Sequence, residues 1–458
     1  MVDSDRKHCY YRGGMKPRKQ SIPAVIKFYI SQFAPWLRPG LGIKRWLFLI
    51  ILGTTMLAVG FAYLLLDFYR SAPDNWVSTL LAFVSLQSFP RVLRALIYGG
   101  SGVAFVVIGI YQINRSLLLP YLKPGKPVVE SLVRYRRLDR GPKVVVIGGG
   151  HGQSTLLRGI KNYTNNLTAI VTVADDGGSS GKIREATGIL PPGDIRNCLA
   201  ALSNDEDLIT QLFQYRFSNG DNTLDGHSFG NLLIQALTEM TGSFERAVVE
   251  SGRVLSINGQ VVPSTLNDVR LIADKNLPHV EREVRVKGES QIPRVRGQVR
   301  RLWLDPINPP AFPAAIRALL QAEMIIIGPG SLYTSILPNL LVPDISAAIR
   351  ASEAFKVFVT NIVTQPGETE NYTCGDHIAA VEDHVGSGLF DLVVCNNNTE
   401  YTLAPINQWV LADPELDNHY PIYRGDFVDP EQPYRHDTEK LSRALIDLFM
   451  ERTGPLAI

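Results

Sequence analysis

Two adjacent carboxylates, Asp175 and Asp176, stand at the end of an apolar run and precede a glycine- and serine-rich stretch (GGSS, 177–180). Neighbouring carboxylates repel each other unless they bind a cation or accept hydrogen bonds. The glycines and serines supply backbone N–H groups and hydroxyls, which suit an anion. The loop could therefore hold a ribose hydroxyl, a divalent metal or both; a plain capping loop is the alternative that involves no ligand.

A second loop, GGGHGQST (148–155), follows the apolar run 143–147 and precedes a stretch that is compatible with a helix. It departs from the dinucleotide pattern GxGxxG, because the sixth position counted from Gly148 is Gln153, and it lacks the lysine of the phosphate loop GxxxxGK[ST]. Glycines nevertheless let backbone N–H groups approach an anion, and Ser154 or Thr155 can cap the next helix, whose N-terminus favours phosphate. We therefore expect a phosphate contact here; a tight turn that only packs helix on strand is the alternative.

Three further segments combine polar side chains with a predicted helix start: PPGDIRN (191–197), GHSFGNLL (226–233) and IGPGSLYTSILPNLL (327–341). In the first, Arg196 can clamp a phosphate or carboxylate. In the second, a histidine and an asparagine four residues apart can share one helical face. Because such segments recur, a pocket for a polyanion is a better interpretation than a set of unrelated caps.

A parallel sheet is the scaffold that would bring these loops together. Short runs rich in Val and Ile alternate with longer stretches of helical spacing, which predicts an α/β fold with helices on both faces of the sheet. Ligands bind such sheets at the carboxyl ends of the strands, where the loops lie. The strand-like runs are 143–147, 168–174, 324–327, 357–362 and 390–395.

The charge of the chain is divided unevenly. The whole chain carries 46 Lys+Arg and 44 Asp+Glu. Residues 1–143 hold 21 Lys+Arg and 6 Asp+Glu, so 25 and 38 remain for the rest, which gives +15 and −13. A basic leader thus precedes an acidic globular body.

The leader contains two spans without charge, Trp46–Leu66 and Ala95–Asn114. The first has 21 residues, and about 20 apolar residues cross the hydrocarbon core as a helix. Residues 1–45 carry 10 Lys+Arg and residues 115–143 carry 8, which predicts that both flanks face the cytoplasm. We expect a multi-pass protein of the bacterial inner membrane, with a buried hairpin of a water-soluble domain as the alternative.

The motifs together resemble a known family. The stretches KVVVIGGGHGQSTLLRGI, TAIVTVADDGGSSGKIR, PPGDIRNCLAALS, DGHSFGNLLIQAL, KGESQI and IGPGSLYTSILPNLLVP are similar in order and spacing to the YvcK family of gluconeogenesis factors, within the CofD-like superfamily. The resemblance covers roughly residues 142–400. It implies a Rossmann-like domain that binds a UDP-sugar such as UDP-N-acetylglucosamine, and a regulatory role in central carbon metabolism, cell-envelope precursor synthesis and cell shape.

The resemblance also has limits and alternatives. CofD itself is a Mg²⁺-dependent 2-phospho-lactate transferase, so a phospho-transferase is the alternative function, and a structural protein without ligand is the third. The family's usual form lacks the membrane hairpin, His151 stands where a threonine is usual, and the region after Tyr401 matches poorly. Partners implied are a nucleotide-sugar, the membrane, an enzyme of amino-sugar synthesis and a second copy of the chain, and nucleic acid is not expected.

Four parts of the chain are predicted: a basic cytoplasmic arm (1–45), two transmembrane helices with a short connection (46–114), a linker (115–141) and the CofD-like domain (142–458). No catalytic residue is assigned, because no nucleophile–base pair stands out. A metal, if bound, would be held by Asp175, Asp176 and Asp194. Glu368 and Asn371 are further candidates for contacts with sugar hydroxyls. The residues predicted to bind the nucleotide or its phosphates are Gly148, Gly149, Gly150, Gly152, Ser154, Asp175, Asp176, Gly177, Gly178, Ser179, Ser180, Asp194, Arg196, Asn197, His227, Asn231, Gly328, Gly330, Ser331, Tyr333, Thr334 and Asn361.

Overall fold

The computed structural model divides the chain into two units, Met1–Tyr135 and Arg136–Ile458. It describes residues 137–453, apart from 205–207, 219–223, 278–281 and 414–419, together with scattered residues between 51 and 108. Only part of each predicted span, Trp46–Leu66 and Ala95–Asn114, lies among the described residues, and both spans stay predictions. Among the residues that are described, no single helix has the length and apolar character needed to cross a membrane.

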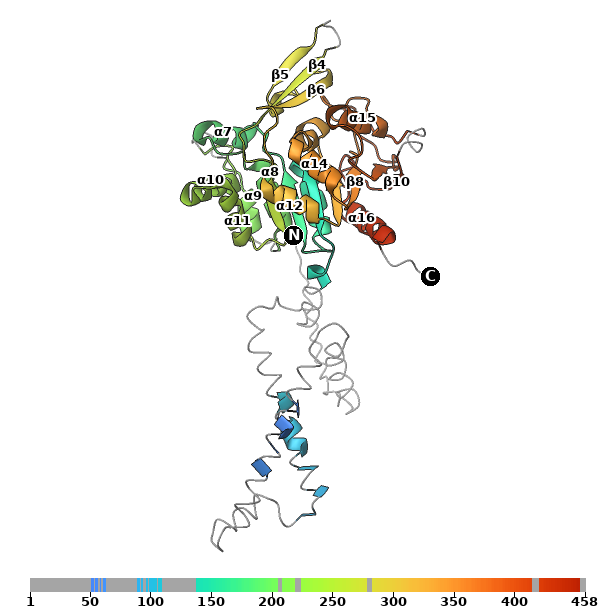
Figure 1. Cartoon of the computed structure of the whole chain (residues 1–458). Coiled ribbons are helices and arrows are strands. Elements are labelled where there is room, and N and C mark those ends of the chain that lie inside the picture. Colours follow the sequence, from blue (N-terminus) through green and yellow to red (C-terminus); the bar gives the residue numbers. More distant parts are fainter. Residues whose placement is uncertain are drawn as a thin grey trace, which may run out of the picture. The chain divides into compact units, whose positions relative to one another are not determined.

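The second unit is built on a seven-stranded sheet with the order β10-β9-β8-β7-β1-β2-β3 (Figure 1). Every neighbouring pair in this sheet is parallel. The strands are β1 (Val144–Gly148), β2 (Leu167–Val171), β3 (Gln260–Pro263), β7 (Met324–Ile327), β8 (Phe355–Val359), β9 (Leu392–Asn396) and β10 (Ile422–Gly425). The predicted parallel α/β fold is confirmed.

The central strands are buried along their whole length. All residues of β1 and β7 are buried, which explains why both read as continuous runs of Val, Ile and Met rather than as alternating patterns. The sequence analysis did not predict the short strands β3 and β10. Strand β3 ends in proline, and β10, an edge strand, is only partly buried.

Helices cover the sheet on two sides. The connection from β1 to β2 contains α6, and the connection from β7 to β8 contains α13 and α14 and runs in the opposite direction across the sheet. Because both crossovers are right-handed, their helices lie on opposite faces of the sheet. Around α6 pack α8 and α16, and α12 packs against α14. The helices are α6 (Gly150–Ile160), α7 (Gly178–Thr187), α8 (Gly193–Leu202), α9 (Leu208–Gln214), α10 (Phe229–Thr241), α11 (Phe244–Val254), α12 (Pro313–Gln321), α13 (Leu337–Leu340), α14 (Pro343–Ala351), α15 (Cys374–Val385) and α16 (Thr438–Thr453), with a 3₁₀ turn η3 (Glu289–Gln291) and a π-helix η4 (Leu332–Ile336).

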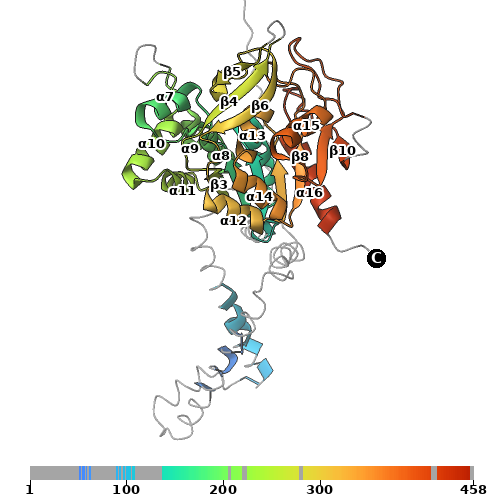
Figure 2. The same ribbon diagram turned by 45° about the horizontal axis from the view of Figure 1, so that its top comes forward.

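An antiparallel arm of three strands, which the sequence analysis did not predict, projects from one end of this unit (Figures 1 and 2). It consists of β4 (Arg270–Asn276), β5 (Val284–Lys287) and β6 (Gln298–Asp305) in the order β5-β4-β6. The turn η3 lies between β5 and β6, so the arm carries Glu289.

Candidate functional site

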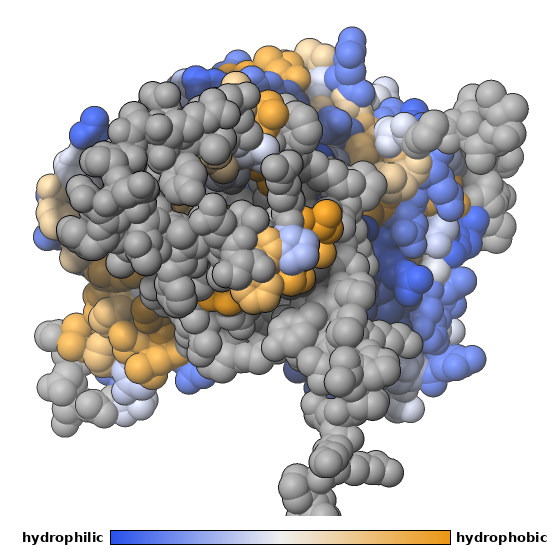
Figure 3. Space-filling model, turned by 90° about the horizontal axis from the view of Figure 1, so that it is seen from below, coloured by the Kyte–Doolittle hydropathy of each residue, from blue (hydrophilic) through white to orange (hydrophobic). Residues whose placement is uncertain are grey.

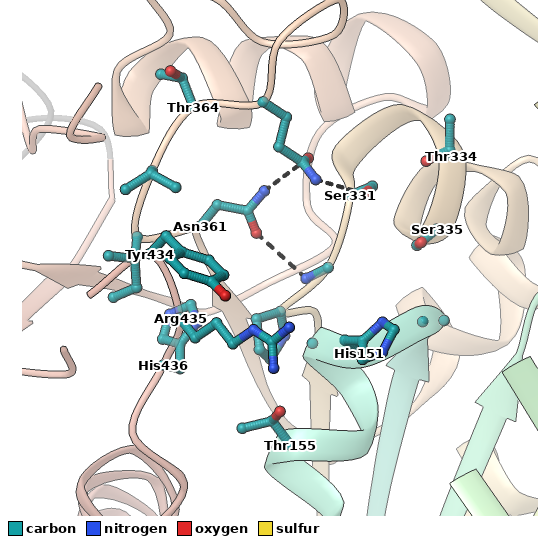
Figure 4. A pocket seen from close by; sticks show the side chains of 18 of the residues that line it. His151, Thr155, Ser331, Thr334, Ser335, Asn361, Thr364, Tyr434, Arg435 and His436 are labelled. Carbon is teal, nitrogen blue, oxygen red and sulfur yellow. Dashed lines mark hydrogen bonds between the residues drawn. The ribbon is translucent and has the colours of Figure 1, made fainter. Parts of the chain in front are cut away.

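The order of the strands determines where a ligand can bind. Successive connections leave β1 toward β2 and β7 toward β8, in opposite directions, so the loops after β1 and β7 separate at a topological switch point. A cavity of about 480 Å³ lies there, within the range of about 300–1,000 Å³ that is usual for ligand pockets (Figure 4). Its lining residues are Gly149, Gly150, His151, Gly152, Thr155, Asp175, Asp194, Glu289, Pro329, Gly330, Ser331, Thr334, Ser335, Asn361, Ile362, Val363, Thr364, Gln365, Pro366, Asn407, Tyr434, Arg435 and His436.

The loop after β1 requires glycine at two positions for different reasons. Gly150 has φ +64°, in the left-handed region that favours glycine. A Cβ on Gly152 would lie 2.6 Å from the carbonyl oxygen of Pro329, so the loops after β1 and β7 are packed backbone to backbone. The N-terminus of α6 has no side-chain cap. The N–H of its first residue, Gly150, donates instead to the carboxyl group of Asp194 on α8, and the next residue, His151, lines the cavity.

Three carboxyl groups, Asp175, Asp194 and Glu289, form the acidic wall of the cavity. Burial, together with the nearby Asp175, raises the pKa of Asp194 to about 7, although the Gly150 N–H donates a hydrogen bond to it. Burial and the neighbouring carboxylates raise the pKa of Glu289 to about 8. Asp175 accepts a hydrogen bond from the Gly177 N–H at 2.8 Å, and burial raises its pKa as well. The acidic wall thus holds protons near neutral pH.

Asp176 does not join this wall. Its Oδ1 accepts a hydrogen bond from the Ser290 N–H at 2.9 Å, which ties the loop after β2 to the base of the arm. Within the part of the chain that the structure describes, no group of three or more His, Cys, Asp or Glu side chains has the arrangement of a metal site. Of the predicted metal ligands, Asp175 and Asp194 line the cavity and Asp176 does not. The third carboxyl group at the cavity belongs to Glu289. The sequence analysis quoted KGESQI but missed Glu289, because nothing in the motif shows that η3 folds back over the loop after β2.

Amide side chains join the loops after β7 and β8 (Figure 4). Asn361 Oδ1 accepts from the Gly330 N–H at 3.4 Å, and Asn361 Nδ2 donates to Gln365 Oε1 at 3.2 Å. Gln365 Nε2 in turn donates to Ser331 Oγ at 2.6 Å. These hydrogen bonds hold the loops after β7 and β8 together. The predicted residues Gly330, Ser331 and Asn361 line the cavity, and so does Gln365, which was not predicted.

The three residues of the segment 434–436, which we term the strap, also line the cavity. Arg435 lies over the ring of Tyr434 at 5.3 Å and extends toward the start of α6, where His151 and Thr155 lie (Figure 4). His436 is buried, and burial lowers its pKa to about 4, so the ring is neutral. The strap follows Tyr401 by more than thirty residues, in the region where motif reasoning stopped, and the sequence analysis missed all three residues.

A second polar cluster lies beside the cavity without lining it. Ser179 Oγ is 3.1 Å from His227 Nδ1, and Asn231 Nδ2 donates to Ser179 Oγ at 3.0 Å. His227 precedes α10 rather than lying on it, so its proximity to Asn231 arises through Ser179 and not through a shared helical face. Arg196 donates to Ser228 Oγ, and to Asn197 Oδ1 at 2.8 Å.

The remaining predicted residues are placed as follows. Tyr333 is buried and its hydroxyl is 2.7 Å from that of Tyr372, away from the cavity. Thr334 lines the cavity and donates to Glu368 Oε1 at 3.4 Å; Glu368 is buried behind it, with a pKa that burial raises to about 7. Asn371 is exposed. Residues that do not line the cavity although they were predicted to bind are Gly148, Ser154, Asp176, Gly177, Gly178, Ser179, Ser180, Arg196, Asn197, His227, Asn231, Gly328 and Tyr333.

Fold and cavity together define a doubly wound α/β protein with a polar cavity at its switch point. Residues 144–449 match the family model described as 2-phospho-L-lactate transferase CofD. The match extends well beyond Tyr401, which corrects the expectation that the resemblance fades there and includes the strap in the family domain.

Curated relatives narrow this class. A gluconeogenesis factor of Bacillus subtilis is 42% identical in an alignment that covers 69% of this chain and 100% of that protein. A relative from Nostoc sp., provisionally named a gluconeogenesis factor, is 46% identical and is aligned over 97% of this chain and 94% of its own length. A crystal structure of a UPF0052 family member from Bacillus halodurans is 40% identical, covers 67% of this chain and 99% of that one, and has a TM-score of 0.62. The chain therefore belongs to the gluconeogenesis factor family.

The relatives also bear on the N-terminal part. The Nostoc alignment leaves 3% of this chain uncovered, so it includes most of residues 1–135. The long leader is thus shared with this relative, although the resemblance had suggested that it departs from the family's usual form.

Proposed function

We propose that the chain is a regulatory protein that binds a UDP-sugar of the UDP-N-acetylglucosamine class in the cavity at the switch point. In this proposal the bound state links central carbon metabolism to the supply of cell-envelope precursors and to cell shape. The observation that carries it is the mixed chemistry of the cavity, whose lining contains the start of α6, His151 and Arg435 together with three carboxyl groups.

Each kind of group suits a different part of such a ligand. Diphosphate oxygens are acceptors only, and they fit the positive N-terminal end of α6 and the guanidinium of Arg435. Sugar and ribose hydroxyls are donors as well as acceptors, and they fit carboxyl groups such as Asp175 and Asp194. Asn361, Gln365 and Ser331 supply further donors and acceptors.

A phospho-transferase is the second candidate. It is favoured by the description of the matching family model and by the carboxyl groups at the cavity. Mg²⁺ would be held by Asp175 and Asp194, with ligand phosphate oxygens completing its shell, and would neutralise charge on a phosphate group. We favour the regulator because the aligned relatives are named as factors and because Ser179 and His227, which form a hydrogen bond typical of a nucleophile and its base, do not line the cavity.

Binding and turnover, measured separately, distinguish the two candidates. Titration calorimetry of the full chain in detergent should show binding of UDP-N-acetylglucosamine, and weaker binding of UDP and GDP. Mass spectrometry after incubation with UDP-sugar, GTP and Mg²⁺ should show no released UMP, UDP or GMP. A chain that binds no UDP-sugar contradicts the proposal, and Mg²⁺-dependent nucleotide release would favour the transferase.

The proposal includes an anchor and partners. Described apolar side chains of the N-terminal unit are strongly exposed, among them Ile51 (55%), Phe61 (63%), Val92 (73%), Leu96 (67%) and Val103 (66%). The space-filling view shows apolar residues, in orange, at the surface of the face that it draws (Figure 3). Exposed apolar surface on this scale suits lipid, which supports anchoring in the inner membrane. An enzyme of amino-sugar synthesis and a second copy of the chain are the proposed protein partners.

A further inference from the structure

His151 is the second residue of α6 and lines the cavity. Its side chain is exposed, and Arg435 of the strap extends toward the same helix start (Figure 4). The helix begins without a side-chain cap and without an acidic residue in its first turn. The imidazole therefore stands at the place where helix N–H groups and a guanidinium converge on the cavity.

The charges that act on this ring come from four arginines on four different elements. They are Arg158 on α6, Arg196 on α8, Arg216 after α9 and Arg435 on the strap. Partial desolvation of the ring by the protein around it, and then these positive charges, lower the pKa of His151 below its usual value. In the ligand-free protein at neutral pH the ring is thus a neutral hydrogen-bond donor in a strongly positive field.

We propose that His151 is a phosphate contact of this site and takes up a proton when the diphosphate of the ligand binds. The inference rests on the proposed nucleotide-sugar function and adds to it a binding residue and a proton. The proton comes from the solvent, and no covalent bond is made or broken.

The physical reason is a reversal of the field at the ring. A diphosphate brings at least two negative charges to a place where only positive charges acted before, and an opposite charge within about 4–6 Å favours the protonated form. The neutral hydrogen bond then becomes a charge-assisted one, which is roughly twice as strong. Affinity should therefore rise as the pH falls through the pKa of the ligand-bound ring, and the rise should end below the pKa of the free ring.

Other groups at the cavity also titrate in this range. Asp194, which accepts a hydrogen bond from the Gly150 N–H beside His151, and Glu289 have pKa values raised to about 7 and about 8. Their effect on affinity is present whatever residue occupies position 151. The ratio of wild-type affinity to the affinity of a His151 variant therefore isolates the contribution of the imidazole.

The test measures binding of UDP-N-acetylglucosamine by titration calorimetry at pH values from 5.5 to 8.5. It uses the full chain in detergent and compares the wild type with His151→Gln and His151→Thr. Both variants keep a neutral donor and remove the titration. Between pH 8 and pH 6 the wild-type to variant affinity ratio should rise about 3- to 10-fold, since one linked proton changes a binding constant by at most about tenfold per pH unit. Repeating the titration at pH 7 in buffers of different ionisation enthalpy should show proton uptake in the wild type that exceeds that of both variants.

The outcomes separate this inference from the function on which it rests. An affinity ratio that does not change with pH, with equal proton uptake in all three proteins, overturns the role of His151 and leaves nucleotide-sugar binding intact. Failure of the wild type to bind at every pH contradicts the proposed function itself. Loss of binding in both His151 variants, with unchanged melting temperatures, would show that the imidazole is needed and support the contact.

Discussion

At the scale of single residues, Asp194 combines two roles that oppose each other. Its carboxyl group accepts a hydrogen bond from the Gly150 N–H, yet burial and Asp175 raise its pKa to about 7. The unfolded carboxyl group ionises near pH 3.9. Since the folded state holds the proton longer, stability due to this group is complete below about pH 4 and is lost as the pH rises to about 7.

We therefore expect Asp194→Asn to flatten the pH dependence of stability in the ligand-free protein. The asparagine can still accept from Gly150 and carries no charge, so its melting temperature at pH 8 should exceed that of the wild type by about 2 °C or more. Differential scanning fluorimetry between pH 5 and pH 8 measures this difference. Glu353→Gln, an exposed carboxyl group away from the cavity, is the matched control and should leave the profile unchanged.

The types of residue in the sequence predicted which loops form the site, but not which side chains in those loops reach the cavity. Glycines before a helix and polar residues after buried strands indicated the loops after β1, β2, β7 and β8, and each of these loops lines the cavity. Which side chain points inward depends on packing between segments far apart in the chain. Asp176 turns toward Ser290, 114 residues away, and Arg435 reaches α6 from near the C-terminus. A single sequence contains no local signal for such contacts.

At the scale of elements, the arm is held to the rest of its unit by a buried lysine on β4. Lys275 is fully buried, and its Nζ donates to the carbonyl oxygens of Ile292 at 2.9 Å and Gly367 at 2.6 Å and to that of Val295. Burial lowers its pKa. The bonds join β4, the segment after η3 and the loop after β8, and η3 carries Glu289 to the cavity.

Lys275→Met should lower the free energy of unfolding by about 2–4 kcal/mol, because three buried carbonyl groups lose their donor. Ligand affinity should fall as well, since Glu289 loses its support. Denaturant unfolding and calorimetry measure the two effects. Arg285→Ala, which removes an exposed partner of Asp274 on the same arm, should change both only slightly; an equal loss in the two variants would contradict the anchoring role of Lys275.

Elements were predictable from the sequence where burial alone determines them. Runs such as Met324–Ile327 lie between two helical layers and must be apolar throughout, so pattern and structure agree. The arm has adjacent charged residues on β4 (Asp274, Lys275) and on β6 (Arg300, Arg301) and buries a lysine, so neither its period nor its composition distinguished it from a loop. Its existence depends on contacts with segments that follow it in the chain.

At the scale of the whole molecule, the chain combines a family domain with a basic leader. The Bacillus subtilis factor is covered completely while 69% of this chain is aligned, and the family model begins at residue 144. The leader carries an excess of 15 positive charges over residues 1–143, and these are concentrated on both sides of the two uncharged spans. Sequence composition is the basis for the predicted topology, since only part of each span is described.

We predict that both ends of the chain lie in the cytoplasm and that the connection between the spans is outside. Lys and Arg resist translocation across the inner membrane, and the connection holds only Arg70, Arg91 and Arg94, whereas the flanks hold 10 and 8 such residues. In intact spheroplasts, Asp74→Cys should react with a membrane-impermeant maleimide. The native Cys9, in the N-terminal arm, should react only after the membrane is permeabilised and serves as the internal control. The full chain should also stay in the membrane pellet after extraction with alkaline carbonate. Release by carbonate, or labelling of Cys9 from outside, would contradict the topology and leave the nucleotide-sugar proposal to be judged by binding alone.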